Sequence, residues 1–319
     1  MKQRNIGIDI LKCIAAILIV NSHMDLLYPN KAFATGGGIG DVLFFFCSGF
    51  TLFLKPMGRF DNWYKKRINR IYPTVFAWAI LGTLFFDLHN DIIYTLLHGG
   101  NWFITCIMLY YIILFLIYKL MINRLNLVYA MSSVGVIIWY IILDRPEHYN
   151  MYGETYFKWG HYFLFMLLGA IMGISKNELR YRFGYDFLKL IGCIIIYYGV
   201  LYASRKFPVA EQLQIISLLP LLGVTFYFYK VANSNILKQI YNHNIWGAVI
   251  NTIGGLCLEI YLVQFSLFTD KLNKFFPLNI IIIFVYIVIA AYILRCLSRI
   301  FSQTFKVQDF DWKAVIKLY

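Results

Sequence analysis

The chain has 319 residues, of which 60% are hydrophobic, 19% aromatic and 14% charged, and its formal net charge is +13. Soluble domains average roughly 45–50% apolar and 25% charged residues, so this composition excludes a water-soluble protein and indicates one that lies in lipid. The 29 Lys and Arg residues occur in short clusters between apolar runs and form no continuous basic face. That distribution argues against a nucleic-acid partner.

Ten apolar runs approach the length of about 20 residues that a helix needs to cross a bilayer. Because lipid offers the backbone no hydrogen-bond partners, such runs must form helices. In chain order they cover residues 8–28, 38–54, 71–88, 102–121, 125–143, 159–175, 187–203, 213–231, 247–268 and 278–297. The predicted fold is an all-α integral membrane bundle of about ten transmembrane helices, with residues 1–319 as a single polytopic domain.

The positive charges predict the orientation. If the N-terminus is cytoplasmic, 22 of the 29 Lys and Arg residues lie at cytoplasmic ends and loops, and the other seven lie outside. This excess predicts that both termini are cytoplasmic and that the number of spans is even. The start also resembles a cleaved signal peptide, with Ala32-Phe33-Ala34 as a cleavage site. A retained first span is favoured, because Asp9 and Lys12 interrupt the apolar part and the apparent site lies late.

Two polar residues of the first span carry the strongest functional signal. Lys12 and His23 are eleven residues apart, about 16 Å along a helix and about 20° from a whole number of turns, so they share one face. Intramembrane polar groups usually face the bundle interior or a water-filled cavity. In the alternative, Lys12 reaches the headgroups and His23 makes a structural hydrogen bond. The neighbouring Asn21, Ser22 and Asp25 favour a functional site.

The second span begins with a glycine-rich stretch, GGGIGDVLFFFCSGF, at residues 36–50. A helix start after glycines offers free N–H groups to an anion or an oxyanion. A tight turn, with Ser48-Gly49 as a close helix-packing site, explains the same residues. The sequence leaves both interpretations open.

A basic segment precedes the third span. KKRINRIYP, residues 65–73, places four cations in six positions. Arg67 and Arg70 are i, i+3 neighbours on one helix face, and such a pair can bind phosphates bidentately. A simple positive-inside anchor explains the cluster equally well.

Several further residues are weaker candidates. Trp102, with Phe103, fits an interfacial aromatic belt, and Glu259 is an acid inside an apolar span that needs a partner. The other histidines are expected in or near loops, in contact with solvent: His89, His98, His148, His161 and His243. The cysteines lie inside apolar segments without a CxxC pair and are expected to be small buried hydrophobes with no metal or disulfide role: Cys13, Cys47, Cys106, Cys193, Cys257 and Cys296.

Taken in order, five groups of residues form one pattern: Asp9, Lys12 and His23; Gly40, Asp41, Phe44, Phe45, Ser48, Gly49 and Phe50; Arg67, Arg70, Tyr72 and Pro73; Trp102 and Phe103; and LEIYLVQ ending at Gln264. This pattern resembles acyltransferase family 3, membrane proteins that O-acylate carbohydrates. Two positions depart from the family pattern. Lys12 stands where the family usually has Arg, which keeps the charge but loses the planar fork, and Gln264 stands where relatives often have His.

The resemblance implies that acyl-CoA, expected to be acetyl-CoA, binds from the cytoplasm as a co-substrate. Its acyl group would pass to a sugar hydroxyl of a cell-envelope or exported polysaccharide or glycolipid. His23 is the expected general base, since an imidazole titrates near ambient pH, and Asp9 and Glu259 are further catalytic candidates. The expected donor-binding residues are Lys12, Ser48, Arg67, Arg70 and Trp102.

No permanently bound cofactor and no metal are expected. The expected partners are acyl-CoA, a carbohydrate or lipid-linked sugar acceptor and the lipid of the inner or plasma membrane, and the sequence leaves both a monomer and a homo-oligomer open. The alternative function is a transporter or flippase for a lipid-linked sugar, followed by a structural membrane subunit. An intramembrane histidine aligned with a cation, together with a cytoplasmic arginine pair, favours the enzyme.

Overall fold

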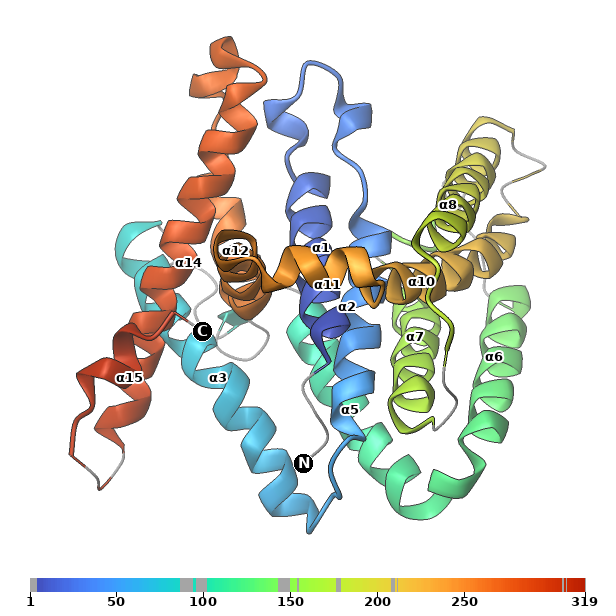
Figure 1. Cartoon of the computed structure of the whole chain (residues 1–319), viewed down its shortest axis with the longest axis horizontal. Coiled ribbons are helices and arrows are strands. Elements are labelled where there is room, and N and C mark those ends of the chain that lie inside the picture. Colours follow the sequence, from blue (N-terminus) through green and yellow to red (C-terminus); the bar gives the residue numbers. More distant parts are fainter. Residues whose placement is uncertain are drawn as a thin grey trace. The chain divides into compact units, whose positions relative to one another are not determined.

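The structure is a computed structural model, and it describes residues 5–86, 94–95, 102–142, 150–153, 155–175, 179–207, 210, 212–305, 307 and 309–318. All regular secondary structure of this described part is helical (Figure 1). The prediction of an all-α protein is therefore confirmed for these residues. The predicted loop positions of His89, His98 and His148 lie outside them.

The chain divides into two compact units, each assembled from separate stretches of sequence. Unit 1 comprises Met1–Ala15, Gly38–Pro56 and Ile117–Ile250, and unit 2 comprises Ala16–Gly37, Met57–Leu116 and Asn251–Tyr319. Four of the five boundaries fall within or at the start of a helix: α1 (Ile6–Ser22), α2 (Gly37–Leu52), α5 (Trp102–Met121) and α12 (Asn244–Gly255). The fifth, between Pro56 and Met57, lies in the connection that follows α2.

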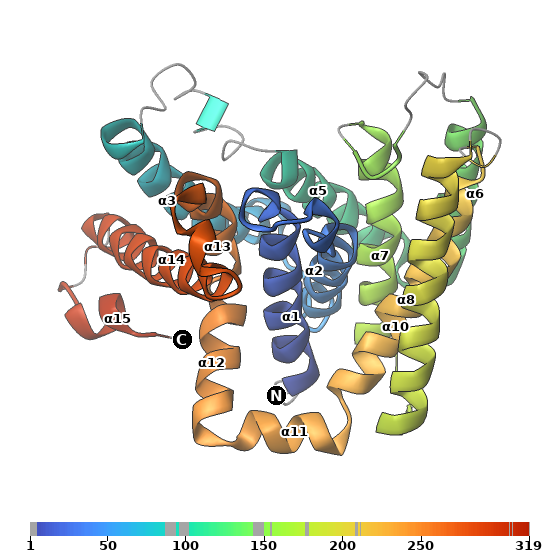
Figure 2. The same cartoon turned by 90° about the horizontal axis from the view of Figure 1, so that it is seen from above.

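Unit 1 is a bundle of long apolar helices. Besides most of α2 it contains α6 (Leu125–Ile142), α7 (Phe157–Ile174), α8 (Phe183–Lys206), α10 (Leu218–Ala232) and α11 (Asn235–Asn242). Helix α6 packs along α7, and α8 packs along α10 (Figure 2). The 3-10 turn η4 (Ile122–Arg124) separates α5 from α6, where the sequence predicts a short loop.

Glycines set the distance between α2 and α7. A Cβ on Gly49 would overlap the carbonyl oxygen of Met166, and one on Gly169 would overlap that of Phe46. Small residues thus let two helix backbones touch, as is common between membrane helices. The structure confirms close helix packing at Gly49, the glycine of the predicted Ser48-Gly49 site.

Unit 2 is organised around one long helix. It contains α3 (Phe60–Phe85), most of α5, α13 (Cys257–Val263), α14 (Leu278–Thr304) and α15 (Trp312–Ile316), with the 3-10 turns η1 (Asp25–Leu27), η2 (Lys31–Phe33), η6 (Gln264–Leu267) and η7 (Asp270–Phe275). Helix α14 packs against α3 and α13. The buried hydroxyls of Thr74 and Ser298, 3.0 Å apart, join α3 to α14.

Length and hydropathy identify six helical segments of the described part that are able to cross a membrane: Lys31–Leu52, Trp102–Ile142, Phe157–Ile174, Phe183–Lys206, Gln214–Ala232 and Leu278–Thr304. The pair Asn244–Gly255 and Cys257–Leu267, bent by 61°, is a seventh if it forms one broken span. The described residues of every predicted range lie largely on helices, and these apolar helices support a multi-pass membrane protein. The count of ten spans and the cytoplasmic termini stay predictions.

Candidate active site

The imidazole of His23 lies at the end of α1, in unit 2. The His23 N–H donates to the Val20 carbonyl at 3.1 Å, so the helix closes with a tight turn before the side chain. The half-buried ring lies 4.7 Å from the ring of Phe265 in η6, with the two planes at 59°. Asp25 is close enough to interact with the imidazole charge. The aromatic contact orients the ring and leaves it partly exposed, as exchange of protons with a substrate requires.

The segment after His23 is tied back to α1 by Asn21. Its amide donates to the carbonyls of Phe33 and Thr35, both at 2.9 Å. Its side-chain oxygen accepts a hydrogen bond of 2.5 Å from the hydroxyl of Tyr28. One side chain therefore holds three points of the connection between α1 and α2, which fixes the surroundings of His23.

The connection reaches α2 through two glycines that face α1. Gly36 has a φ of 105°, a conformation that other residues rarely adopt. A Cβ on Gly37 would lie 2.7 Å from the hydroxyl oxygen of Ser22. These contacts support the predicted tight turn, and binding of an anion at the start of α2 stays a prediction.

Arg67 and Arg70, which the sequence pairs on one helix face, have different surroundings in the structure. Arg70 is exposed, whereas Arg67 is half-buried. The guanidinium carbon of Arg67 lies 5.0 Å from the ring centroid of Trp63 and 5.8 Å from that of Tyr111. Its Nε is buried and has no hydrogen-bond partner among the described residues. Arg67 is thus a positioned cation with a free donor, while Arg70 resembles a solvated anchor.

Aromatic residues hold Arg67 in place. Trp63 and Tyr111 are 6% and 7% exposed, and their rings meet edge to face at 6.1 Å. Phe115 packs on Trp63 at 5.4 Å. Trp63 lies one turn before Arg67 on α3, a spacing that sequence reasoning can find. Tyr111 and Phe115 come from α5, so only the fold reveals them.

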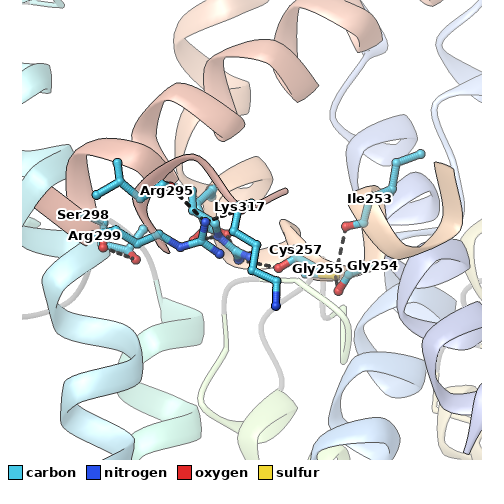
Figure 3. A network of polar contacts seen from close by, with 11 residues as sticks. Ile253, Gly254, Gly255, Cys257, Arg295, Ser298, Arg299 and Lys317 are labelled. Atoms are coloured by element: carbon cyan, nitrogen blue, oxygen red, sulfur yellow. Dashed lines mark hydrogen bonds and ion pairs between the residues drawn. The ribbon is translucent and has the colours of Figure 1, made fainter. Parts of the chain in front are cut away.

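Glu259 has the partner that its position in an apolar span requires. Arg295 of α14 donates from Nε and from one terminal nitrogen to the two carboxylate oxygens at 2.9 and 2.8 Å. The same guanidinium also donates to the carbonyl of Gly255, the last residue of α12 (Figure 3). A single arginine therefore bridges the bend between α12 and α13.

Gln264 is the first residue of η6 and precedes Phe265, whose ring contacts His23. It is fully buried, and its amide donates to the Tyr261 carbonyl at 3.3 Å. Its side-chain oxygen is buried without a partner among the residues that the structure describes.

Trp102, which begins α5, packs on Phe103 at 5.9 Å, and Phe103 packs on Tyr261 at 5.4 Å.

The last described residues return along α14. Gln303 and Asp311 exchange two hydrogen bonds of 2.9 and 2.7 Å. Arg299 donates to the carbonyls of Val315, at 3.0 Å, and Lys317. Figure 3 shows that Arg295 and Arg299 bind different segments. Arg295 donates to a carbonyl at the bend between α12 and α13, and Arg299 donates to a carbonyl of the C-terminal segment.

The remaining predicted site residues belong to unit 1. Asp9 is half-buried and accepts a 3.5 Å hydrogen bond from the Tyr241 hydroxyl. Lys12, also half-buried, lies on the same helix, and Ser48 lies half-buried on α2. His23, by contrast, is part of unit 2. The alignment of Lys12 with His23 therefore stays a prediction.

The expectation for His161 is wrong. His161 was expected in contact with solvent near a loop, but it lies inside α7 and is fully buried. His243 is exposed, as predicted. Among the cysteines, Cys13, Cys47 and Cys106 are buried, as expected for small hydrophobes, and the other three are half-buried.

Comparison with known proteins gives one match. The family model described as an acyltransferase domain, that of acyltransferase family 3, matches residues 5–296. The match includes every predicted site residue and parts of both units. No curated protein and no solved structure matches the chain.

Proposed function

The chain belongs to acyltransferase family 3, and on that premise we propose that it is a membrane O-acyltransferase that uses cytoplasmic acyl-CoA. The acyl group, expected to be acetyl, is transferred to a sugar hydroxyl of a cell-envelope or exported polysaccharide or glycolipid. Family membership supports the acyltransferase activity. The donor, the acyl chain and the acceptor are our proposal.

The observation that carries the proposal for the donor is the environment of Arg67. Two aromatic rings fix its guanidinium, and its buried Nε lacks an acceptor among the described residues. A buried donor without a partner costs about 1–3 kcal/mol, so a ligand that brings an acceptor is favoured. Coenzyme A carries several phosphate oxygens, which arginine binds in fork geometry.

In the proposed reaction His23 acts as the general base. The imidazole accepts the proton of the sugar hydroxyl while the sugar oxygen attacks the thioester carbonyl. The carbon–sulfur bond then breaks, and the coenzyme A thiolate takes up the proton. Atoms and charges balance without a further reactant. The half-buried ring beside Phe265 supports this role.

The other predicted residues have more distant roles in the proposal. Lys12, Ser48, Arg70 and Trp102 would contribute to donor binding, and Asp9 would assist catalysis. For Glu259 the ion pair with Arg295 supports a positioning role at the helix bend rather than proton transfer. Both units would form one multi-pass domain in the cell membrane, with ten spans and both termini in the cytoplasm.

The test uses the purified full-length protein in liposomes with radiolabelled acetyl-CoA. Binding of acetyl-CoA and transfer of label to an added oligosaccharide are measured separately. The proposal requires saturable binding and transfer that depends on His23. Movement of a lipid-linked sugar across the bilayer without any acyl transfer would instead identify a transporter or flippase.

A further inference from the structure

Unit 1 contains a polar cluster to which the steps described above assign no role. We call it the tyrosine cluster, and its members are Asp41 of α2, Tyr152 before α7, Lys158, His161 and Tyr162 of α7, and Tyr197 of α8. Lys158, His161, Tyr162 and Tyr197 are 7%, 0%, 1% and 3% exposed. Ionisable groups are rare inside membrane proteins, and they usually mark a functional site.

The members form a connected set. The hydroxyl of Tyr162 donates a hydrogen bond to the Asp41 carboxylate, and Lys158 is an electrostatic neighbour of the same carboxylate. Tyr197 and Tyr152 are hydrogen-bonded to each other. The Tyr152 hydroxyl also lies 2.5 Å from that of Ser217.

His161 is the member without a hydrogen-bond partner of normal geometry among the described residues. Its ring is packed between aromatic neighbours, with Tyr162 at 4.4 Å and Tyr152 at 5.2 Å. The Phe157 carbonyl, one turn earlier, is a neighbouring acceptor, but neither ring nitrogen makes a hydrogen bond of normal geometry with any described residue. Buried polar side chains in native proteins nearly always have a partner. His161 therefore has unused hydrogen-bonding capacity that a polar ligand could satisfy.

The cluster is partly accessible at the start of α2. Asp41 and Tyr152 are half-buried, as is Gly38. A Cβ on Gly38 would lie 2.7 Å from the Tyr197 hydroxyl oxygen. Glycine at this position lets the backbone of α2 approach the Tyr197 hydroxyl, so this phenol lies next to the half-buried start of α2.

The donors and acceptors of the cluster indicate the class of ligand. A carboxylate only accepts hydrogen bonds, an ammonium only donates them, and phenols and a neutral imidazole do both. Lys158 would repel a simple cation, and Asp41 would repel a simple anion. A neutral polyhydroxyl compound fits the mixture, since each hydroxyl both donates and accepts, and aromatic faces cover its apolar side.

We propose that the tyrosine cluster binds the carbohydrate acceptor. This inference rests on the proposed function, because it names the place at which the acceptor of that reaction is held. It assigns Tyr162 and His161 as acceptor-binding residues, with Asp41 holding the Tyr162 hydroxyl.

The experiment compares two tyrosines of unit 1. Tyr162→Phe removes a hydroxyl of the cluster. Tyr140→Phe is the matched control, because Tyr140 is 2% exposed and donates a 3.0 Å hydrogen bond to the Gln212 carbonyl outside the cluster. The probes are neutral oligosaccharides of glucose, galactose, rhamnose and N-acetylglucosamine, scored for direct binding and for acetyl transfer. Tyr162→Phe should raise the acceptor KM roughly tenfold or more, with acetyl-CoA binding unchanged, and Tyr140→Phe should not.

A second variant, His161→Phe, tests whether misfolding explains a loss of sugar binding. It fills a similar volume and removes two nitrogens that have no partner in the described part of the chain, so the thermal midpoint should stay the same or rise. Sugar binding should nevertheless be lost. If both cluster variants match Tyr140→Phe, or if no probe binds the parent, the inference is overturned and a buried water serves His161. If a probe binds and the cluster variants abolish that binding, but no acetyl transfer occurs, the inference stands and the proposed function fails.

Discussion

Trp63→Leu should weaken coenzyme A binding, although the Trp63 indole contacts the Arg67 guanidinium and neighbouring rings rather than the proposed ligand. The guanidinium carbon of Arg67 lies 5.0 Å from the Trp63 centroid and the indole is 6% exposed. A partly desolvated cation–π contact contributes about 0.5–2 kcal/mol. Loss of this contact corresponds to a roughly 2- to 30-fold increase in Kd.

Three further variants allow the loss of coenzyme A affinity in Trp63→Leu to be compared with larger and smaller losses. Arg67→Ala removes charged hydrogen bonds of about 1.5–3 kcal/mol, which corresponds to a loss of affinity of roughly 10- to 150-fold. Arg70→Ala should cost much less, since Arg70 is exposed and exposed ion pairs contribute about 0–1 kcal/mol. Trp63→Phe keeps an aromatic face and should restore most of the affinity that Trp63→Leu loses.

The assay is isothermal titration of coenzyme A, dephospho-coenzyme A and pantetheine into the purified protein. Trp63→Leu and Arg67→Ala should weaken binding of the phosphate-bearing ligands and leave pantetheine binding alone. Thermal unfolding of each variant checks that α3 still packs on α5. Parental affinity in Trp63→Leu, or a larger loss in Arg70→Ala than in Arg67→Ala, would refute the assignment of Arg67 as the held cation.

Three other outcomes are expected. His23→Ala should bind coenzyme A like the parent while acyl transfer falls by about 10² to 10⁴-fold; near-parental transfer would place the base elsewhere. A cysteine introduced at Asn62 should be protected from an impermeant thiol reagent added outside, and one at Asn150 should react; the reverse pattern would overturn the topology. Glu259→Gln should lower stability by about 3 kcal/mol, toward the lower end for a broken buried pair, because Arg295 keeps 19% of its side chain exposed. An unchanged thermal midpoint in that variant would argue against a bridge at the helix bend.

The positions of the long apolar helices follow from hydropathy, because lipid forces an apolar segment to satisfy its own backbone. The short helices α11 and α15 lie outside every predicted range. The segments able to cross the membrane are harder to predict. The basic run at residues 65–70 lies inside helix α3, and the ninth predicted range contains the 61° bend between α12 and α13. Arg295 bridges that bend from a different helix, and the sequence pattern cannot identify such a contact.

For the site residues, too, nearby sequence predicts some features, whereas contacts between distant segments depend on the fold. The need of Glu259 for a partner follows from its apolar surroundings, but the identity of Arg295, 36 residues away, depends on packing. Arg67 and Arg70 look equivalent on a helical wheel, and Tyr111 from α5 makes them different. His161 was expected in solvent because it lies near the start of a predicted span. Its burial depends on Tyr152 and Tyr162, and the ring of Tyr152 reaches it from outside α7.

The C-terminal segment on α14 has a practical consequence for protein engineering. Arg299 and Gln303 hold the backbone of residues 311–317, and the Tyr292 hydroxyl donates to the Ile316 carbonyl at 2.6 Å. A tag inserted within residues 311–317 would therefore break contacts with α14 as well as change the segment itself. Arg295, which bridges the bend, lies one turn before Arg299 on the same helix. A deletion within residues 311–317 thus changes the support of α14 as well as the length of the chain.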